Sequence, residues 1–209
     1  MLPRHDTLFD ADGPLVVGAG LAGLFTALKL GPNPVTVLSP MPLGEGASSA
    51  WAQGGVAAAV GAGDSAEAHA RDTVTAGAGT VDASIARSVA TEAAARIEDL
   101  ARLGTPFDRD AAGHYLQSRE AAHSAHRVVR VRGDRAGKAI MQALIAAVRA
   151  TPSIRVIEGI EVDDLALAAG RVAGVFARRA SDPWSAPILF CASETVLATG
   201  GIGGLYQVT

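Results

Sequence analysis

The stretch Pro14-Leu-Val-Val-Gly18-Ala-Gly20-Leu-Ala-Gly23 decides the fold that this sequence predicts. Its apolar start, its glycine-rich turn and the apolar segment that follows predict a short buried strand leading directly into a helix. The spacing Gly-x-Gly-x-x-Gly permits a tight turn, close approach of a pyrophosphate to backbone N–H groups, and close packing of the helix on the strand. The helix N-terminus then faces the phosphate charge. The stretch therefore predicts a dinucleotide-binding turn.

The next residues complete a β–α–β unit. Gly31-Pro-Asn-Pro34 ends the helix, and Val35-Thr-Val-Leu38 predicts a second buried strand. Ser39-Pro40 stands where an acidic side chain commonly binds the ribose hydroxyls after this strand. A serine hydroxyl can also form such a hydrogen bond. We therefore expect an α/β, Rossmann-like domain built on a parallel sheet.

A long loop over residues 39–63 is rich in Gly, Ser, Pro and Ala, and long loops in compact domains are usually functional. Its segment Glu45-Gly-Ala-Ser48-Ser49-Ala50-Trp51-Ala52-Gln53-Gly54-Gly55 combines hydroxyls, an aromatic ring, an amide and a Gly-Gly pair, which can line a planar heterocycle. Taken alone, the segment is better explained as an ordinary Gly/Ser surface loop.

Three helices and several strands are predicted beyond this loop. Asp64 caps a helix that runs to Thr75, Asp82 caps a helix that ends at Gly104, and Asp134 begins a third that ends before Pro152. The second helix should place Ile85, Val89, Ala93, Ile97 and Leu100 on one face, and the third should do so with Ile140, Leu144 and Val148. Strands are expected over 154–158, over 162–167 and 172–177 as a hairpin, and over 195–198, the last leading into Thr199-Gly200-Gly201.

Composition and charge narrow the class of protein. The net charge of −3 gives no case for nucleic acid or an anionic membrane surface. The arginines between Arg127 and Arg135 are interspersed with valines, so a half-buried strand and turn is favoured over a polyanion site. Cys191 is the single cysteine, which favours a reducing compartment and a buried small apolar role over a nucleophile. The first thirteen residues do not resemble a signal peptide, and we expect a soluble cytoplasmic protein.

Taken together, the motifs resemble one superfamily. The glycine turn, the loop Ser48-x-x-x-x-Gln53-Gly-Gly and the final Ala198-Thr-Gly-Gly201 are similar in order and spacing to the succinate dehydrogenase/fumarate reductase flavoproteins. Within them, Asp72-Thr-Val-Thr-Ala-Gly-Ala-Gly79, Arg119-Glu120-x-x-His123-Ser124 and the closing segment 205–209 resemble the L-aspartate oxidase family. The resemblance covers nearly the whole chain from Pro14.

The resemblance implies that FAD is the cofactor. Respiratory members attach the flavin covalently to a histidine at the position of Ser48, so this chain is expected to bind FAD non-covalently. No metal site is expected. The residues expected to contact FAD are Gly18, Ala19, Gly20, Leu21, Ala22, Gly23, Ser39, Pro40, Ser48, Ser49, Ala50, Trp51, Ala52, Gln53, Gly54, Gly55, Val162, Thr199 and Gly200.

The implied reaction is the oxidation of L-aspartate to iminoaspartate, with hydride passing from Cα to flavin N5 and O2 or fumarate as the final acceptor. This would be the first step of NAD synthesis through quinolinate, with quinolinate synthase as a candidate partner. Glu120 is the expected partner of the substrate ammonium, and His123 is a second candidate catalytic residue. His126, Arg119 and Arg127 are weaker candidates for contacts with substrate carboxylates or flavin.

Two departures and two alternatives accompany this interpretation. The family's usual Glu-Gly-Gly-His appears as Glu120-Ala-Ala-His123, and its Asp-Ala-Thr-Gly appears as Asp134-Arg-Ala-Gly137. A soluble fumarate reductase and a non-catalytic nucleotide-binding module remain alternative functions. Residues 1–209 are expected to form the amino-terminal part of an FAD-binding domain, incomplete and inactive without the capping and C-terminal helical domains of the family.

Overall fold

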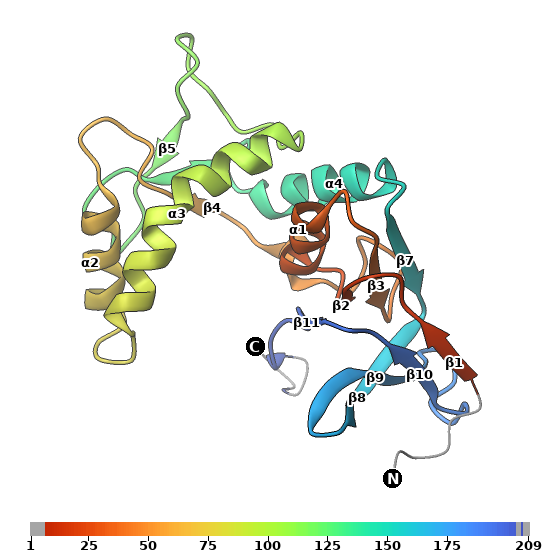
Figure 1. The fold of residues 1–209 in the computed structure, drawn as a ribbon. Coiled ribbons are helices and arrows are strands. Elements are labelled where there is room, and N and C mark those ends of the chain that lie inside the picture. Colours follow the sequence, from red (N-terminus) through yellow and green to blue (C-terminus); the bar gives the residue numbers. More distant parts are fainter. Residues whose placement is uncertain (1–6, 204–205, 207–209) are drawn as a thin grey trace. The chain divides into compact units, whose positions relative to one another are not determined.

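The computed structural model describes residues 7–203 and Tyr206. The closing segment 205–209, apart from Tyr206, lies outside the described residues. The chain divides into two compact units (Figure 1): unit 1 is built from residues 1–50 and 144–209, and unit 2 from residues 51–143. Among the described residues, unit 1 has two sheets and unit 2 has one, and each unit has its own buried residues.

Unit 1 contains the parallel sheet that the glycine motif predicts. Its four strands run in the order β11 (Thr195–Leu197), β2 (Leu15–Val17), β3 (Val35–Ser39) and β7 (Ile154–Glu158), and every neighbouring pair is parallel. Helix α1 (Leu21–Leu30) connects β2 to β3. The predicted β–α–β unit and the return of the last strand to this sheet are therefore confirmed.

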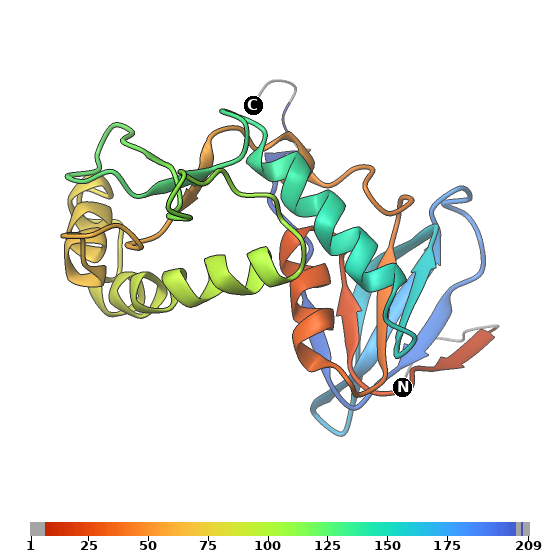
Figure 2. The same ribbon diagram turned by 90° about the horizontal axis from the view of Figure 1, so that it is seen from above.

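A second sheet of unit 1 packs on one face of the parallel sheet (Figure 2). Its strands lie in the order β1 (Thr7–Asp10), β10 (Ile188–Cys191), β9 (Arg171–Arg179) and β8 (Ile160–Ala168). Leu15, Val17 and Leu38 contact this sheet, whereas Val16 lies toward Gly23 of α1 on the opposite face. The alternation of inward and outward side chains along β2 thus buries both faces of the strand.

The predicted hairpin is confirmed in β8 and β9, which are longer than expected. Strands β1 and β10 were not expected from the sequence. They pair in parallel, with Phe9 opposite Phe190, and extend the hairpin sheet on the β9 side. Cys191 ends β10 half-buried, and burial raises the pKa of its thiol, which fits a small apolar role.

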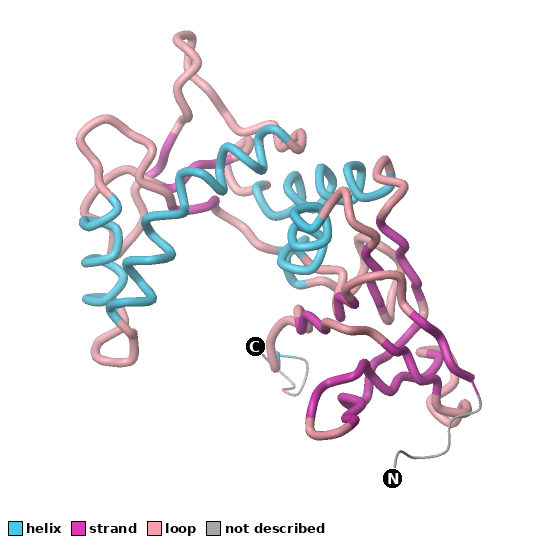
Figure 3. The backbone as a smooth tube through the Cα atoms, in the orientation of Figure 1, coloured by secondary structure: helices cyan, strands magenta, loops and turns pink. Residues whose placement is uncertain are grey.

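Unit 2 consists of two helices, long loops and a small sheet (Figure 3). Its helices are α2 (Ala66–Ala76) and α3 (Ala83–Arg102), and its antiparallel sheet has the order β4 (Gly55–Ala57), β6 (Val128–Arg130) and β5 (Gln117–Ser118). A 3₁₀ turn, η1 (Ser48–Trp51), and helix α4 (Ala136–Arg149) span the boundaries between the units.

The helix predictions hold in position but not in every detail. Ser65, not Asp64, is the N-cap of α2, because the Ser65 hydroxyl accepts the Ala68 N–H at 3.1 Å while Asp64 pairs with an arginine. Ile85 and Val89 are 61% and 63% exposed, so only the later part of the predicted apolar face of α3 is buried. Helix α4 begins at Ala136 rather than Asp134, and its predicted face is buried as expected.

The arginine-rich segment forms strand β6 followed by a turn, as predicted. No helix of the described residues has the length and apolar character that a membrane span requires.

Candidate functional site

A cavity of about 630 Å³ lies in unit 1 at the carboxyl ends of β2, β3 and β11. Its size falls within the range of about 300–1,000 Å³ that is usual for small-molecule sites. In open parallel sheets, ligands bind beyond the carboxyl ends of the strands. The lining residues come from four segments of unit 1, namely residues 18–22, 39–41, 45–49 and 197–203 without Ile202.

Three glycines shape the turn at the floor of this cavity. Gly18 has φ +110°, and a Cβ there would lie 2.2 Å from the carbonyl oxygen of Ala198. A Cβ on Gly23 would lie 1.9 Å from the carbonyl oxygen of Gly18, so the helix and the strand pack too closely for a side chain. Gly20 is different, because a Cβ there would meet only ordinary contacts, 3.6 Å from Ser49 Oγ. The first two glycines are required by the fold, and the third leaves open space in the cavity.

Helix α1 begins at this turn without a side-chain cap and without an acidic residue in its first turn. Its N-cap is Gly20, and the Leu21 N–H donates to Ser49 Oγ at 3.3 Å. The positive end of the helix dipole therefore opens into the cavity and suits an anionic group. The hydrogen bond also joins the glycine turn to the serine part of the second motif, which the sequence predicted to act with it.

Side chains at the ends of β3 and β7 hold the loop that forms the cavity wall. Ser39 is buried, and its hydroxyl donates to the carbonyl oxygen of Met41 at 2.6 Å. The Leu43 N–H donates to Glu158 Oε1 at 2.7 Å. Because the Ser39 proton is directed at Met41, the hydroxyl oxygen is available to the cavity as an acceptor.

The predicted cofactor residues fall into two groups. The cavity lining includes Gly18, Ala19, Gly20, Leu21, Ala22, Ser39, Pro40, Ser48, Ser49, Thr199 and Gly200, and Gly23 lies directly behind it. Ala50 ends the first segment of unit 1, the run 51–55 belongs to unit 2, and Val162 packs against the apolar core of unit 1. Contacts of this second group with a cofactor stay predictions.

Several lining residues were not predicted. They are Met41, Glu45, Gly46, Ala47, Leu197, Ala198, Gly201 and Gly203. Glu45, Gly46 and Ala47 lie within the loop motif, and Ala198 and Gly201 lie within the closing motif, although none of the five was among the residues expected to contact FAD. Met41, Leu197 and Gly203 lie one or two positions from a motif or an expected contact.

In unit 2, the Gly-Gly pair of the second motif lies beside Glu120. A Cβ on Gly54 would lie 3.1 Å from Glu120 Oε1, and Gly54 has φ +75°. Gly55 begins β4, where a Cβ would lie 2.1 Å from the carbonyl oxygen of Val129. The exposed carboxylate predicted to bind substrate and the loop predicted to line the cofactor are therefore neighbours within one unit.

A tight turn presents Glu120. The His123 N–H donates to the Glu120 carbonyl oxygen at 3.2 Å, and Arg119 Nε donates to the His123 carbonyl oxygen at 3.0 Å. Ala122 has φ +70°, a left-handed conformation that favours glycine. The backbone of Ala122 thus has a conformation typical of glycine, and the L-aspartate oxidase family, which the sequence resembles, usually has glycine at this position.

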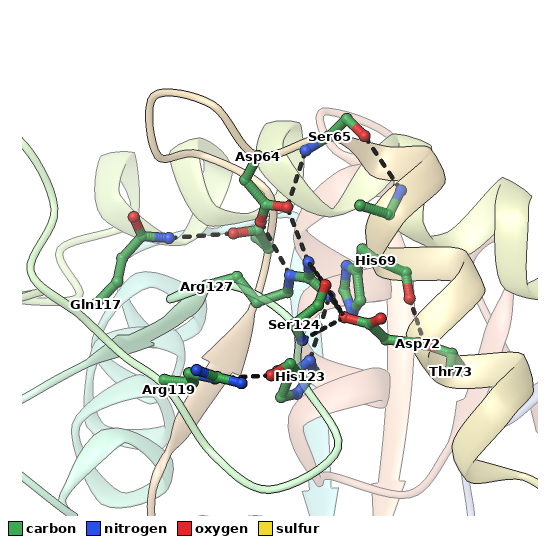
Figure 4. Close-up of polar contacts among 12 residues, drawn as sticks. Asp64, Ser65, His69, Asp72, Thr73, Gln117, Arg119, His123, Ser124 and Arg127 are labelled. Atoms are coloured by element: carbon green, nitrogen blue, oxygen red, sulfur yellow. Dashed lines mark hydrogen bonds and ion pairs between the residues drawn. The ribbon is translucent and has the colours of Figure 1, made fainter.

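Arg127 is the centre of a buried charge cluster in unit 2 (Figure 4). Its Nε and Nη2 donate to the two carboxylate oxygens of Asp64 at 2.9 and 2.8 Å, and its Nη1 donates to Asp72 Oδ2 at 2.5 Å. The side chain of Arg127 is 0% exposed. The expectation that Arg127 contacts substrate or flavin is therefore wrong, because its donors are directed at two carboxylates.

Two histidines lie against this cluster. His69 is buried on α2, and its ring meets that of His123 edge to face with a centroid distance of 5.8 Å. Burial, followed by the charges of Arg127 and His123, lowers the pKa of His69, so this ring is neutral near pH 7. His123 is half-buried, and Arg127 Nη1 lies 3.4 Å from its Nδ1. His126 is exposed.

Asp72 gives this cluster a pH dependence. The Ser124 backbone N–H, the Ser124 hydroxyl and Arg127 together lower the pKa of Asp72 from 3.8 to about 2. Because the folded-state pKa is below the unfolded value, the stabilisation is fully present above pH 3.8 and is lost as the pH falls toward 2. We expect the urea-unfolding free energy to fall more steeply between about pH 4 and pH 2 for the unmodified chain than for Asp72→Asn. Parallel slopes would contradict this assignment.

Comparison with known proteins places these features in context. Residues 14–209 match the family described as FAD binding domain. An L-aspartate oxidase of Caulobacter vibrioides is 50% identical over 202 residues, which is 95% of this chain and 39% of the relative.

Solved structures share the fold. Sdh1 of Mycobacterium smegmatis, determined in complex with UQ1, superposes with a TM-score of 0.87 at 30% identity, covering 97% of this chain and 36% of the other. The FrdA subunit of E. coli quinol fumarate reductase superposes with a TM-score of 0.85 at 25% identity, covering 96% and 34%. The chain thus spans little more than a third of the length of the proteins that it resembles.

Proposed function

Because the chain belongs to the FAD binding domain family, we propose that it forms the FAD-binding part of an enzyme that oxidises L-aspartate to iminoaspartate. The observation that carries the cofactor assignment is the N-terminus of α1, which has glycine as its N-cap and no acidic residue in its first turn and opens into a cavity of about 630 Å³. The substrate assignment is supported by the 50% identity to an L-aspartate oxidase and by the exposed carboxylate of Glu120 beside Gly54.

The residues of unit 1 fit the nucleotide part of FAD. The first-turn N–H groups of α1 and the open space at Gly20 suit the pyrophosphate, and Ser39 suits a ribose hydroxyl as an acceptor. Thr199 and Gly200 close the cavity from the end of β11. Ser48 also lines it and offers no imidazole for covalent attachment, so we propose non-covalent binding. Bound FAD supplies the acceptor for the hydride that leaves the substrate Cα.

Glu120 would provide the selectivity for an amino acid. The substrate ammonium is a cation, and the exposed carboxylate of Glu120 can form an ion pair with it. Succinate and fumarate carry no ammonium group. Oxidation removes a hydride from Cα and a proton from the ammonium nitrogen, which leaves the protonated imine, and loss of a second proton gives iminoaspartate. The two electrons taken from L-aspartate pass finally to O2 or fumarate. The place of the reaction in NAD synthesis and a contact with quinolinate synthase stay predictions.

The substrate assignment is tested by anaerobic mixing of the FAD-loaded whole protein with L-aspartate or succinate. We expect L-aspartate to bleach the flavin absorbance and succinate to leave it unchanged. Bleaching by succinate alone would identify a fumarate reductase-like enzyme, and bleaching by neither would favour a nucleotide-binding module. Either of these results contradicts the proposal.

Glu120→Gln is expected to raise the KM for L-aspartate about ten- to hundredfold, because a hydrogen bond to a charged group contributes about 1.5–3 kcal/mol. FAD affinity should not change. The matched control is Glu92→Gln, which removes an exposed carboxylate of α3 in the same unit. A KM within twofold of the unmodified protein would contradict the role of Glu120.

A further inference from the structure

The segment 119–127, which carries Glu120 and His123, has little secondary structure to define it. Within this segment Glu120, Ala121, Ala122, Ser124 and His126 are exposed, and the backbone forms only turns before β6 begins at Val128. Short exposed turns are normally among the more mobile parts of a protein. A protein carboxylate that binds substrate, such as that of Glu120, needs an additional restraint when it lies on such a segment, because catalysis depends on accurate positioning.

Asp72 supplies that restraint from α2. One carboxylate oxygen, Oδ2, accepts the Ser124 N–H and the Ser124 hydroxyl, each at 2.7 Å, and the Arg127 Nη1 at 2.5 Å. The carboxylate thus contacts the segment at two points that are three residues apart (Figure 4). Asp64 fixes the other edge of the Arg127 guanidinium through two hydrogen bonds, and the backbone of Arg127 accepts the Ala58 N–H at 2.9 Å.

The restraint continues to Glu120 by short steps. Arg127 Nη1 lies 3.4 Å from His123 Nδ1, and the His123 N–H donates to the Glu120 carbonyl oxygen at 3.2 Å. Arg119 on the other side of the turn donates to the His123 carbonyl oxygen. A chain of three polar contacts, from Asp72 to Arg127, from Arg127 to His123 and from His123 to Glu120, therefore connects α2 to the proposed substrate-binding residue.

The charge balance of the cluster indicates that Asp72 is more than a neutralising partner. Asp64 alone neutralises the Arg127 guanidinium through a bidentate pair, in which the side chains of the two residues are 0% and 3% exposed. Asp72, with a side chain 16% exposed, is a second carboxylate on the same cation. Its Oδ2 accepts the N–H and hydroxyl of Ser124 as well as the Arg127 guanidinium, so it also fixes the segment.

We propose that Asp72, acting through Ser124 and Arg127, is a positioning residue that holds Glu120 in place for substrate binding. This inference rests on the proposed function. It predicts that loss of the Asp72 charge loosens residues 120–126 and weakens substrate binding, while cofactor binding in unit 1 is preserved.

The test uses Asp72→Asn in the whole FAD-loaded protein. This variant should fold, because Arg127 remains neutralised by Asp64 and the asparagine keeps the shape of the side chain. We expect backbone amides of residues 120–126 to exchange hydrogen at least tenfold faster, and the KM for L-aspartate to rise at least tenfold. The kcat should change less than threefold and the FAD affinity less than twofold. Ser124→Ala, which removes only the hydroxyl contact, should also raise the exchange rate of residues 120–126 and the KM for L-aspartate, each by a smaller factor.

The matched control is Asp110→Asn. Asp110 also accepts backbone N–H groups in a loop of unit 2, but its partners Ala112 and His114 lie outside the 119–127 segment. It should leave exchange at 120–126 and the KM unchanged. Unchanged exchange in Asp72→Asn, or faster exchange with an unchanged KM, would overturn the inference. If the unmodified protein does not oxidise L-aspartate, the proposed function fails, and the exchange result still shows whether Asp72 restrains the segment.

Discussion

Arg127→Met is expected to lose about 3–5 kcal/mol of unfolding free energy, because it removes one partner from a buried ion cluster. The variant would leave the carboxylates of Asp64 and Asp72, whose side chains are only 3% and 16% exposed, without the guanidinium that balances their charge. Methionine fills part of the volume but donates no hydrogen bond. Urea unfolding at pH 7, followed by circular dichroism, measures the loss.

Two further variants separate the burial of charge from the loss of packing. Arg87→Met removes an exposed arginine from α3 of the same unit and should change the unfolding free energy by no more than about 0.5 kcal/mol. Combining Arg127→Met with Asp64→Asn and Asp72→Asn removes the unpaired charges and should recover at least half of the loss. A loss below about 1 kcal/mol for Arg127→Met alone would contradict the cluster as described.

Gly20→Ala is expected to weaken FAD binding at least tenfold, or by about 1.4 kcal/mol or more, and to leave the fold intact. Gly20 has φ −77°, and a Cβ there would be no closer than 3.6 Å to any neighbour. The methyl group would instead occupy the space in front of the α1 N-terminus, where the pyrophosphate is proposed to approach the backbone. Calorimetric titration with FAD measures the affinity, and thermal unfolding checks the fold.

Gly31→Ala provides the matched control at the other end of α1. Gly31 has φ −56°, and the contact closest to an added Cβ is the Leu28 carbonyl oxygen at 3.3 Å, outside the cavity. Its FAD affinity should equal that of the unmodified chain. Gly18→Ala and Gly23→Ala are less informative, because their clashes of 2.2 and 1.9 Å with backbone oxygens would disturb the fold itself. Equal affinity for Gly20→Ala and Gly31→Ala would contradict the proposed pyrophosphate position.

The elements best predicted from the sequence are those whose residues interact locally. The glycine spacing of the turn from Gly18 to Gly23 is a local sequence signal, so β2, α1 and β3 were placed within a residue or two. The apolar face of α4 was also correct, since Ile140, Leu144 and Val148 are buried. Both patterns are formed by residues close together in the sequence and leave few alternative structures.

The features that were missed depend on partners distant in sequence. Within the part of the chain that the structure describes, strand β1 pairs only with β10, about 180 residues away, and no local pattern in Thr7–Asp10 indicates this pairing. Asp64 was expected to cap α2, but Arg127, 63 residues later, binds its carboxylate and Ser65 becomes the cap. Ile85 and Val89 follow the helical period yet are exposed, because periodicity defines a face of a helix without showing what covers it. The role of Arg127 was missed because its partners, Asp64 and Asp72, are also distant in sequence.

The central claim is that the Gly18–Gly23 turn and the Ser48–Ser49 segment hold the pyrophosphate of FAD. An experimental structure of the chain with FAD bound tests it most directly. We expect pyrophosphate density at the N-terminus of α1, within hydrogen-bonding distance of the first-turn N–H groups and beside Gly20. Density for FAD elsewhere on the chain, with the α1 N-terminus filled only by solvent, would contradict it.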